Sequence, residues 1–409
     1  MIGRNSDGIR SAGAWPPRGV ITTGDQLMAV WTTWILLATI VIWTASGGSG
    51  GPAYARIDPN NHAKYIIYSL PLTLSGAYWL SFGVDRIRID ERGLAALGIY
   101  SVLAVTGIAA NSWTEFYAIR DLTIICSYLL LFVFWFRAPD SAIDVCLVAL
   151  ALCQVIELAI RFTPGVTLID ADSLYAMLGL ANPSVRYTAL IGPHSLLEST
   201  LGFPLGVIVL YYVHNRRWRL ALMAGFLLLL AFKRISFAGV IVALTFDAIT
   251  RNRTRLRSAK RMAALAAIGL SITAIYSVLV FQSAADALQL KNSSADAISL
   301  GRYDIALLLW SRWHDASVLN WLIGFGAGAA DSISEVFQSN PHNDWLKILF
   351  DYGVIGFLVI HAVFFLIFAR HRVGLMIYLY NTVLMMPDNV FIYMYHYPFI
   401  ALIMCAERE

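Results

Sequence analysis

Apolar stretches separated by short polar segments run along almost the whole chain. Many are close to the roughly 20 residues that a helix needs to cross a bilayer. In lipid a backbone amide finds no water, so such a crossing must satisfy its own hydrogen bonds as a helix. Of the 409 residues, 58% are hydrophobic and 14% are charged, which excludes ordinary soluble domains. The sequence therefore predicts an all-α integral membrane protein, a single polytopic domain over residues 1–409.

We expect about twelve transmembrane helices, and we expect the first apolar run to be retained because no small-residue cleavage site follows it. The predicted spans are 27–46, 65–84, 93–110, 122–136, 141–160, 196–213, 219–232, 235–250, 262–282, 344–369, 374–386 and 389–405.

Lys and Arg residues cluster in four of the segments between these spans. Short cytoplasmic loops carry an excess of such residues. All four clusters fall on one side if both termini are cytoplasmic, so the sequence predicts that orientation. The clusters are Arg86, Arg88 and Arg92; Arg216, Arg217 and Arg219; residues 251–261; and Arg370 with Arg372.

Lys233 and Arg234 interrupt an apolar block, residues 219–250. The loops at both ends of this block are basic, so both are predicted to be cytoplasmic. The block is about 48 Å long as a helix, so it must cross twice, with Lys233 and Arg234 at the outer turn. Two interpretations fit this position. The side chains snorkel to lipid headgroups, or they form an anion site, because ionisable groups at membrane depth usually face a cavity.

The same outer side carries the two longest loops, 161–195 and 283–343. Within the second, residues 299–315 place apolar side chains at helical spacing, which predicts a helix lying on the membrane surface. These side chains are Ile305, Leu308, Leu309 and Trp313. Trp310, Trp313 and Trp321 suit the interfacial belt.

His342 precedes a predicted span whose start is marked by Pro341 and Asn343. The positive end of a helix disfavours imidazolium and attracts anions, so a neutral, proton-accepting His342 beside a phosphate is one interpretation. A lone histidine at a membrane boundary without a function is the other. Further along, Asp344, Lys347 and Asp351 share a helix face and are expected to pair with one another.

The segment from His342-Asn343 through Gly353 to Gly356 resembles the signature of the O-antigen ligases. Gly301-Arg302 upstream and the Lys233-Arg234 turn resemble the two external arginine positions of that family. The related O-antigen and exopolysaccharide polymerases carry similar His-Asn segments, and are often described by an external arginine followed by glycine eleven positions later. No external arginine here has that glycine, which favours a ligase.

The resemblance implies a metal-independent, cofactor-free glycosyltransferase of the membrane-embedded, GT-C-like class in a bacterial inner membrane. Its active site would be periplasmic, with 283–343 as a long periplasmic loop. The donor would be a glycan on undecaprenyl pyrophosphate. The acceptor would be lipid A-core for a ligase, or another lipid-linked glycan for a polymerase. Membrane lipids are expected partners and nucleic acid is not.

Arginine suits the charge that develops on a pyrophosphate leaving group, because its fixed fork donates several hydrogen bonds. Arg234 and Arg302 are the candidates for this role, with Lys233 as a third cation. His342 would accept the acceptor proton, and Asn343 beside it is a candidate substrate-binding residue.

Arg186 and His194 in the first external loop are candidates to line the same cavity, against ordinary loop roles. The glycine-rich segment 324–329 lacks a preceding strand, so nucleotide binding is excluded. The four cysteines fall in or beside spans without metal-ligand spacing. A lipid-linked glycan transporter is the alternative of another class, although no internal repeat supports it.

Overall fold

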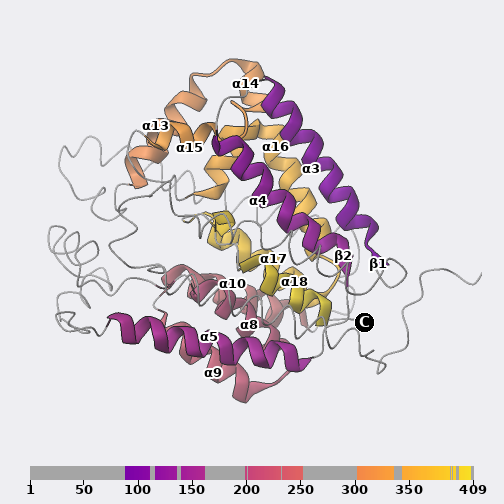
Figure 1. Ribbon diagram of the computed structural model, residues 1–409, viewed down its shortest axis with the longest axis vertical. Helices are drawn as coiled ribbons and strands as arrows, with labels where there is room; N and C mark the ends of the chain where they lie inside the picture. The colour runs from indigo at the N-terminus through magenta and orange to yellow at the C-terminus, as the bar shows by residue number, and fades with distance from the viewer. Residues whose placement is uncertain are drawn as a thin grey trace, which may run out of the picture.

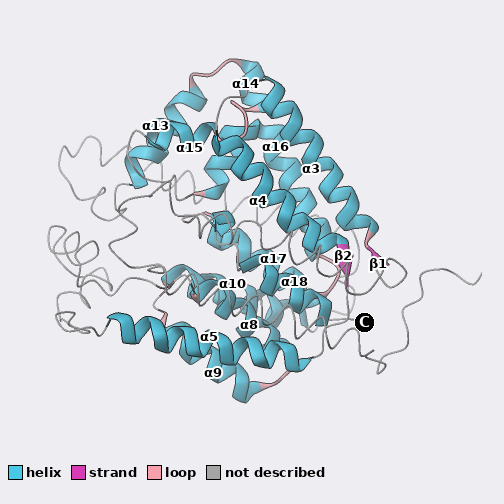
Figure 2. Ribbon diagram, in the orientation of Figure 1, coloured by secondary structure: helices cyan, strands magenta, loops and turns pink. Residues whose placement is uncertain are grey.

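The computed structural model in Figure 1 describes residues 88–110, 116–135, 140–161, 199, 201–231, 233–251, 302–335, 343–386, 388, 390–392 and 396–406. Over these residues the chain is mostly helical (Figure 2), as the all-α prediction requires. Two short antiparallel strands of two residues each are also described, β1 (Arg88–Ile89) and β2 (Phe134–Trp135).

Helices lie at nine of the predicted spans within the described part of the chain. They are α3 (Glu91–Ala110), α4 (Phe116–Val133), α5 (Asp140–Arg161), α8 (Gly202–His214), α9 (Trp218–Leu230), α10 (Arg234–Arg251), α16 (Asp344–Phe368), α17 (Arg372–Met385) and α18 (His396–Ala406). The predicted spans 27–46, 65–84 and 262–282 lie outside the described residues. Among the helices described, α16 alone is long and apolar enough to cross a membrane unaided, so twelve crossings stay a prediction.

The outward faces of α3, α5 and α9 are apolar. Large exposed apolar faces are rare on soluble monomers and suit contact with lipid. The side chains are Leu94, Ile99, Val102 and Val105 on α3, Val145, Val148, Leu152 and Val155 on α5, and Leu222, Met223, Phe226 and Leu229 on α9.

Helix α8 lies at the centre of the lower part of Figure 1, where α9, α10, α17 and α18 pack around it. Every residue from Gly202 to Tyr212 is buried. Gly206 and Gly239 leave room for the ring of Tyr380, which a side chain at either position would meet. The Tyr380 hydroxyl donates a hydrogen bond to the Phe203 carbonyl at 2.9 Å. The contact of α8, α10 and α17 therefore depends on two glycines, Gly206 and Gly239, that face the large ring of Tyr380.

Ion pairs gather at one end of the helices, where three of the predicted basic clusters lie. Arg217 donates to Asp144 at 2.6 Å, and this hydrogen bond raises the pKa of the arginine above its ordinary value. At the same end, the aspartates that start α3 and end α10 are paired with the α16–α17 turn. The pairs are Arg370 with Asp90 and Arg372 with Asp247. The basic turns are therefore neutralised by aspartates at neighbouring helix ends.

Three shorter helices lie beside the first half of α16 in Figure 1: α13 (Arg302–His314), α14 (Val318–Ile323) and α15 (Ala329–Glu335). The helix predicted over 299–315 is α13, but its apolar face packs inward. Ile305, Leu309 and Trp313 are buried in a cluster with α15 and α16. These three side chains contact protein rather than lipid, and a position of α13 on the membrane surface stays a prediction.

Candidate functional site

The start of α16 lies where local sequence signals predict it. Asn343 is the N-cap, and its side-chain oxygen accepts a hydrogen bond from the Leu346 amide at 2.9 Å. This cap satisfies one of the amides that a helix start leaves without an intrahelical partner. A role for Asn343 in substrate binding stays a prediction. His342 lies outside the described residues.

Asp344 joins this helix start to the segment between α17 and α18. Its buried carboxylate accepts hydrogen bonds from the amides of Val390 and Phe391, at 2.5 and 3.0 Å. Its own amide donates to the Asp388 carbonyl at 3.3 Å. Pairing of Asp344 with Lys347 along its own helix stays a prediction. The carboxylate holds a chain segment some 46 residues away.

Lys233 reaches the same segment from the turn between α9 and α10. Its ammonium lies 2.6 Å from a carboxylate oxygen of Asp388, and both side chains are more than nine-tenths buried. The ammonium also lies 5.0 Å from the centre of the Phe203 ring, and the lysine stem crosses α8 at Gly202, where a β-carbon would approach it to 2.5 Å. Lys233 therefore does not snorkel to headgroups. Its predicted role in binding substrate stays a prediction.

Through Asp388, the Lys-Arg turn is connected to the first turn of α16, although more than 100 residues separate the two motifs. Arg234 is the first residue of α10, directly after Lys233. The sequence analysis missed Asp388. A polar Pro-Asp-Asn break between two predicted spans was the available signal.

The start of α13 is also close to the first half of α16. Arg302 is the first residue of α13. One turn later, Ile305 is fully buried in a cluster that includes Leu346 and Phe350 of α16. The helix starts that carry Arg302 and Asn343 are therefore held by one small core. The side chains of Arg234 and Arg302 lie outside the description, so their convergence on one cavity stays a prediction.

Lys347 is surrounded by carboxylates from three helices. Its ammonium contacts Asp121 of α4 at 2.5 Å and also Asp331 of α15. The predicted partner Asp351 lies 4.0 Å away, which confirms that part of the expected stripe. Among the residues described, no group of His, Cys, Asp and Glu could hold a metal ion. Here the lysine itself supplies the positive charge that ties α4, α15 and α16 together.

Helix α16 is broken at Gly353, which has φ 65° and ψ −172°. A left-handed residue strongly favours glycine. The break frees two carbonyl groups, and the glycine-rich loop after α14 satisfies them. Phe325 and Gly326 donate to the carbonyls of Phe350 and Asp351 at 2.9 and 2.8 Å. The close approach at Gly353 is made by the backbone of Leu322 at the end of α14 and of Gly324 in the loop that follows it.

The same loop explains the glycine rhythm of residues 324–329. Gly324, Gly326 and Gly328 all have positive φ, at 80°, 102° and 78°. The Asp351 carboxylate accepts hydrogen bonds from the amides of Gly328 and Ala330, at 3.2 and 2.7 Å. Successive amides of this kind form an anion-binding concavity. Its occupant here is the Asp351 carboxylate of the chain itself.

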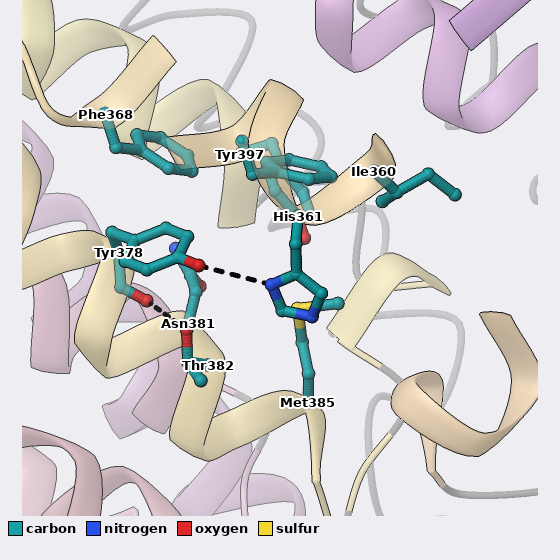
Figure 3. Close-up of a pocket in the computed structure, with 9 residues that line it drawn as sticks. Ile360, His361, Phe368, Tyr378, Asn381, Thr382, Met385 and Tyr397 are labelled. Atoms are coloured by element: carbon teal, nitrogen blue, oxygen red, sulfur yellow. Dashed lines mark hydrogen bonds between the residues drawn. The ribbon is translucent and has the colours of Figure 1, made fainter. Parts of the chain in front are cut away.

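A small pocket, lined mainly by apolar surface, lies between α16, α17 and α18 (Figure 3). His361 stacks on Trp345 at 3.3 Å between ring centres, and its Nδ1 lies 3.2 Å from the Tyr378 hydroxyl. Among the described residues, His361 Nε2, Asn381 Nδ2 and the Tyr397 hydroxyl have no hydrogen-bond partner. The pocket has room for about one water molecule, so it is too small for a sugar. Sequence reasoning did not predict it.

Arg186 and His194 lie outside the described residues, as His342 does. No known protein family matches the chain, and no curated protein matches it either. The function is therefore inferred from the chemistry and geometry of the residues.

Proposed function

We propose that the chain is an O-antigen ligase, a GT-C-like membrane glycosyltransferase that transfers a glycan from undecaprenyl pyrophosphate to the sugar of lipid A-core. One observation carries the proposal: the Lys233 side chain and the start of α16 meet at Asp388. Two motifs that resemble those of the ligases therefore come together, and α13, which begins at Arg302, packs against the first half of α16.

In the proposed reaction the acceptor hydroxyl attacks the anomeric carbon of the donor glycan. The new bond joins the acceptor oxygen to that carbon, and the bond from the carbon to the phosphate oxygen breaks. The electron pair leaves with undecaprenyl pyrophosphate, whose charge Arg234 and Arg302 stabilise. His342 accepts the hydroxyl proton. The positive end of α16, where His342 and Asn343 precede the helix, also favours an anion.

The charges at the two ends of the helices support a periplasmic site. The arginines of the predicted cytoplasmic clusters pair with aspartates at one end, including Arg370 just after α16. Asn343 and Lys233 belong to the opposite ends of α16 and α10. If the basic end is cytoplasmic by the positive-inside trend, the candidate site faces the periplasm of a bacterial inner membrane.

A polymerase that uses the same donor with another lipid-linked glycan as acceptor remains the alternative within the class. A transporter of lipid-linked glycans is the second candidate, and the broken helix α16 favours it. Transporters often form their sites from discontinuous helices near the membrane midplane. The buried ion pairs of Lys347 with Asp121 and Asp331 are polar groups of this kind.

Reconstitution in liposomes with an undecaprenyl-pyrophosphate-linked glycan separates these candidates. A ligase releases undecaprenyl pyrophosphate and glycosylates added lipid A-core, whereas a polymerase elongates the lipid-linked glycan without it. A transporter moves the donor across the bilayer and releases nothing. Arg302→Ala is expected to abolish product formation, while Arg312→Ala, on the exposed side of the same helix, serves as the matched control. Donor transport without pyrophosphate release by the parent protein would overturn the proposal.

A further inference from the structure

Helix α14 exposes apolar side chains within what the sequence predicts to be an external loop. Val318, Leu319 and Leu322 are 78%, 62% and 44% exposed, and α14 buries none of its residues. Trp321 is also exposed, yet its indole nitrogen donates to the Trp313 carbonyl at 2.8 Å, and the two rings stack. A helix of this composition is unsuited to water.

The position of α14 along α16 gives its depth. A β-carbon at Gly353 would lie 2.4 Å from the carbonyl group of Leu322, so the end of α14 touches the break in α16. Gly353 precedes Phe368, the last residue of α16, by fifteen positions, or about 22 Å of helix. Tilt only reduces this depth. The hydrocarbon core is about 30 Å thick, so a helix that starts at one boundary places Gly353 well inside the other.

Helix α3 gives an independent measure of the same depth. Arg370 and Asp90 pair at the shared end of α16 and α3. A β-carbon at Gly356 would lie 3.4 Å from a methyl group of Leu103. Leu103 lies twelve positions after the start of α3, and Gly356 lies twelve positions before the end of α16, which is about 18 Å of helix in each case. The two helices therefore agree on the level at which the break and α14 lie.

The backbone of this segment meets the condition that hydrocarbon imposes, because its polar groups find partners inside the protein. Ser317 caps the start of α14 by accepting from the Asn320 amide at 3.2 Å. At its end, the Gly324 amide donates to the Asn320 carbonyl at 2.8 Å. The next two amides, of Phe325 and Gly326, bind the carbonyls freed by the break in α16.

The surroundings of α14 match a place just below the headgroups. Helix α14 packs against α16, on which the apolar side chains of Ile355 and Leu358 are exposed. Immediately before α14, the side chains of His314 and Asp315 are 67% and 79% exposed. Apolar groups thus follow charged ones over three residues, as at a lipid–water boundary.

We propose that residues 318–326 form a re-entrant segment, and that the exposed face of α14 contacts the acyl chains of the outer leaflet. This inference rests on the proposed membrane crossing of α16 and on no catalytic step. It removes part of the long loop 283–343 from the periplasm. The candidate site then lies next to a segment that enters the outer leaflet. The pyrophosphate of a lipid-linked donor would lie at the same membrane boundary.

Site-directed spin labelling in nanodiscs tests this placement. A nitroxide on Leu319→Cys is compared with labels on Asp315→Cys and Leu358→Cys, and the labelled parent, with its four natural cysteines, supplies the background. Oxygen, which concentrates in lipid, should relax the label at 319 more than a water-soluble nickel complex does. The label at 358 should behave in the same way, and the label at 315 in the opposite way.

Two results would overturn the proposal. Stronger relaxation of the 319 label by nickel than by oxygen would place α14 in water, and protection from both would place it against protein. The label at 358 reports separately on α16. If that label is also accessible to nickel, the membrane crossing itself fails, and with it the membrane setting of the proposed enzyme. If only the 319 label is accessible, the re-entrant segment fails alone.

Discussion

Replacing Gly353 by alanine should release the loop from α16 and destabilise the protein. The residue has φ 65° and ψ −172°, a backbone region that is essentially confined to glycine and where a side chain costs about 1 to 3 kcal/mol. The new β-carbon would lie 2.4 Å from the Leu322 carbonyl group and 2.5 Å from the Gly324 amide nitrogen, and both are backbone atoms. Relieving these contacts breaks the two hydrogen bonds that Phe325 and Gly326 donate to α16. Each contributes about 0.5 to 1.5 kcal/mol.

The expected total loss is roughly 2 to 6 kcal/mol. Unfolding entropy is about 2.1 cal per mol per kelvin per residue, so for a 409-residue chain this loss lowers Tm by roughly 2 to 7 °C. Tryptophan fluorescence of purified protein in nanodiscs measures the change. Gly225→Ala is the matched control, since its added β-carbon meets no atom within 4 Å and alanine is the better helix former. Equal melting of Gly353→Ala and the parent would refute the account of the break.

Three further predictions concern the candidate site. Lys233→Met and Asp388→Asn should each cost about 3 to 5 kcal/mol, because each leaves a buried partner uncompensated. The double variant should melt closer to the parent than either single one, and additive losses would show that the two groups are not coupled. Arg302→Lys should lower kcat in the liposome assay, since a point charge does not reproduce the planar fork; full activity would reduce Arg302 to a positioning charge. His342→Ala should abolish single-turnover transfer and leave donor affinity intact if it accepts the proton. If donor affinity falls with turnover, His342 contacts phosphate instead, and wild-type turnover would exclude both roles.

Local signals in the sequence predicted where the described helices lie, although the predicted starts of α4, α8 and α18 differ from the structure by six or seven residues. Apolar runs between polar breaks predicted α3, α5 and α16 to within a few residues. Asn343 after a proline predicted the start of α16, and the structure confirms it as the cap. These features depend on residues within a turn of one another, so a single sequence contains the information.

Partners far apart in sequence were not predictable in this way. The sequence predicted that the Lys233 ammonium contacts lipid headgroups or an anion, whereas its pairing with Asp388 depends on how α8, α10 and α17 pack. The partners of Lys347 at Asp121 and Asp331 likewise come from other helices. A helical face shows which residues point the same way, but not which neighbour they meet.

The break in α16 belongs to the same group of features. Glycine in an apolar helix usually permits close helix packing rather than a break. The left-handed backbone of Gly353 becomes favourable only because the loop after α14 supplies amides to the freed carbonyls of Phe350 and Asp351. The two glycine patterns, at 324–328 and at 353, are two halves of one contact.

The pairing of Lys233 with Asp388 also limits which cations can stabilise the charge of the donor pyrophosphate. Its ammonium is balanced by Asp388, and the Asp344 carboxyl group lies at the same helix start. Lys347 adds no free positive charge, because carboxylates from α4 and α15 contact it. An anionic donor therefore needs other cations here, and the proposal assigns them to Arg234 and Arg302. Lys233 then serves as a positioning residue, since its buried pair fixes the turn from which α10 and Arg234 begin.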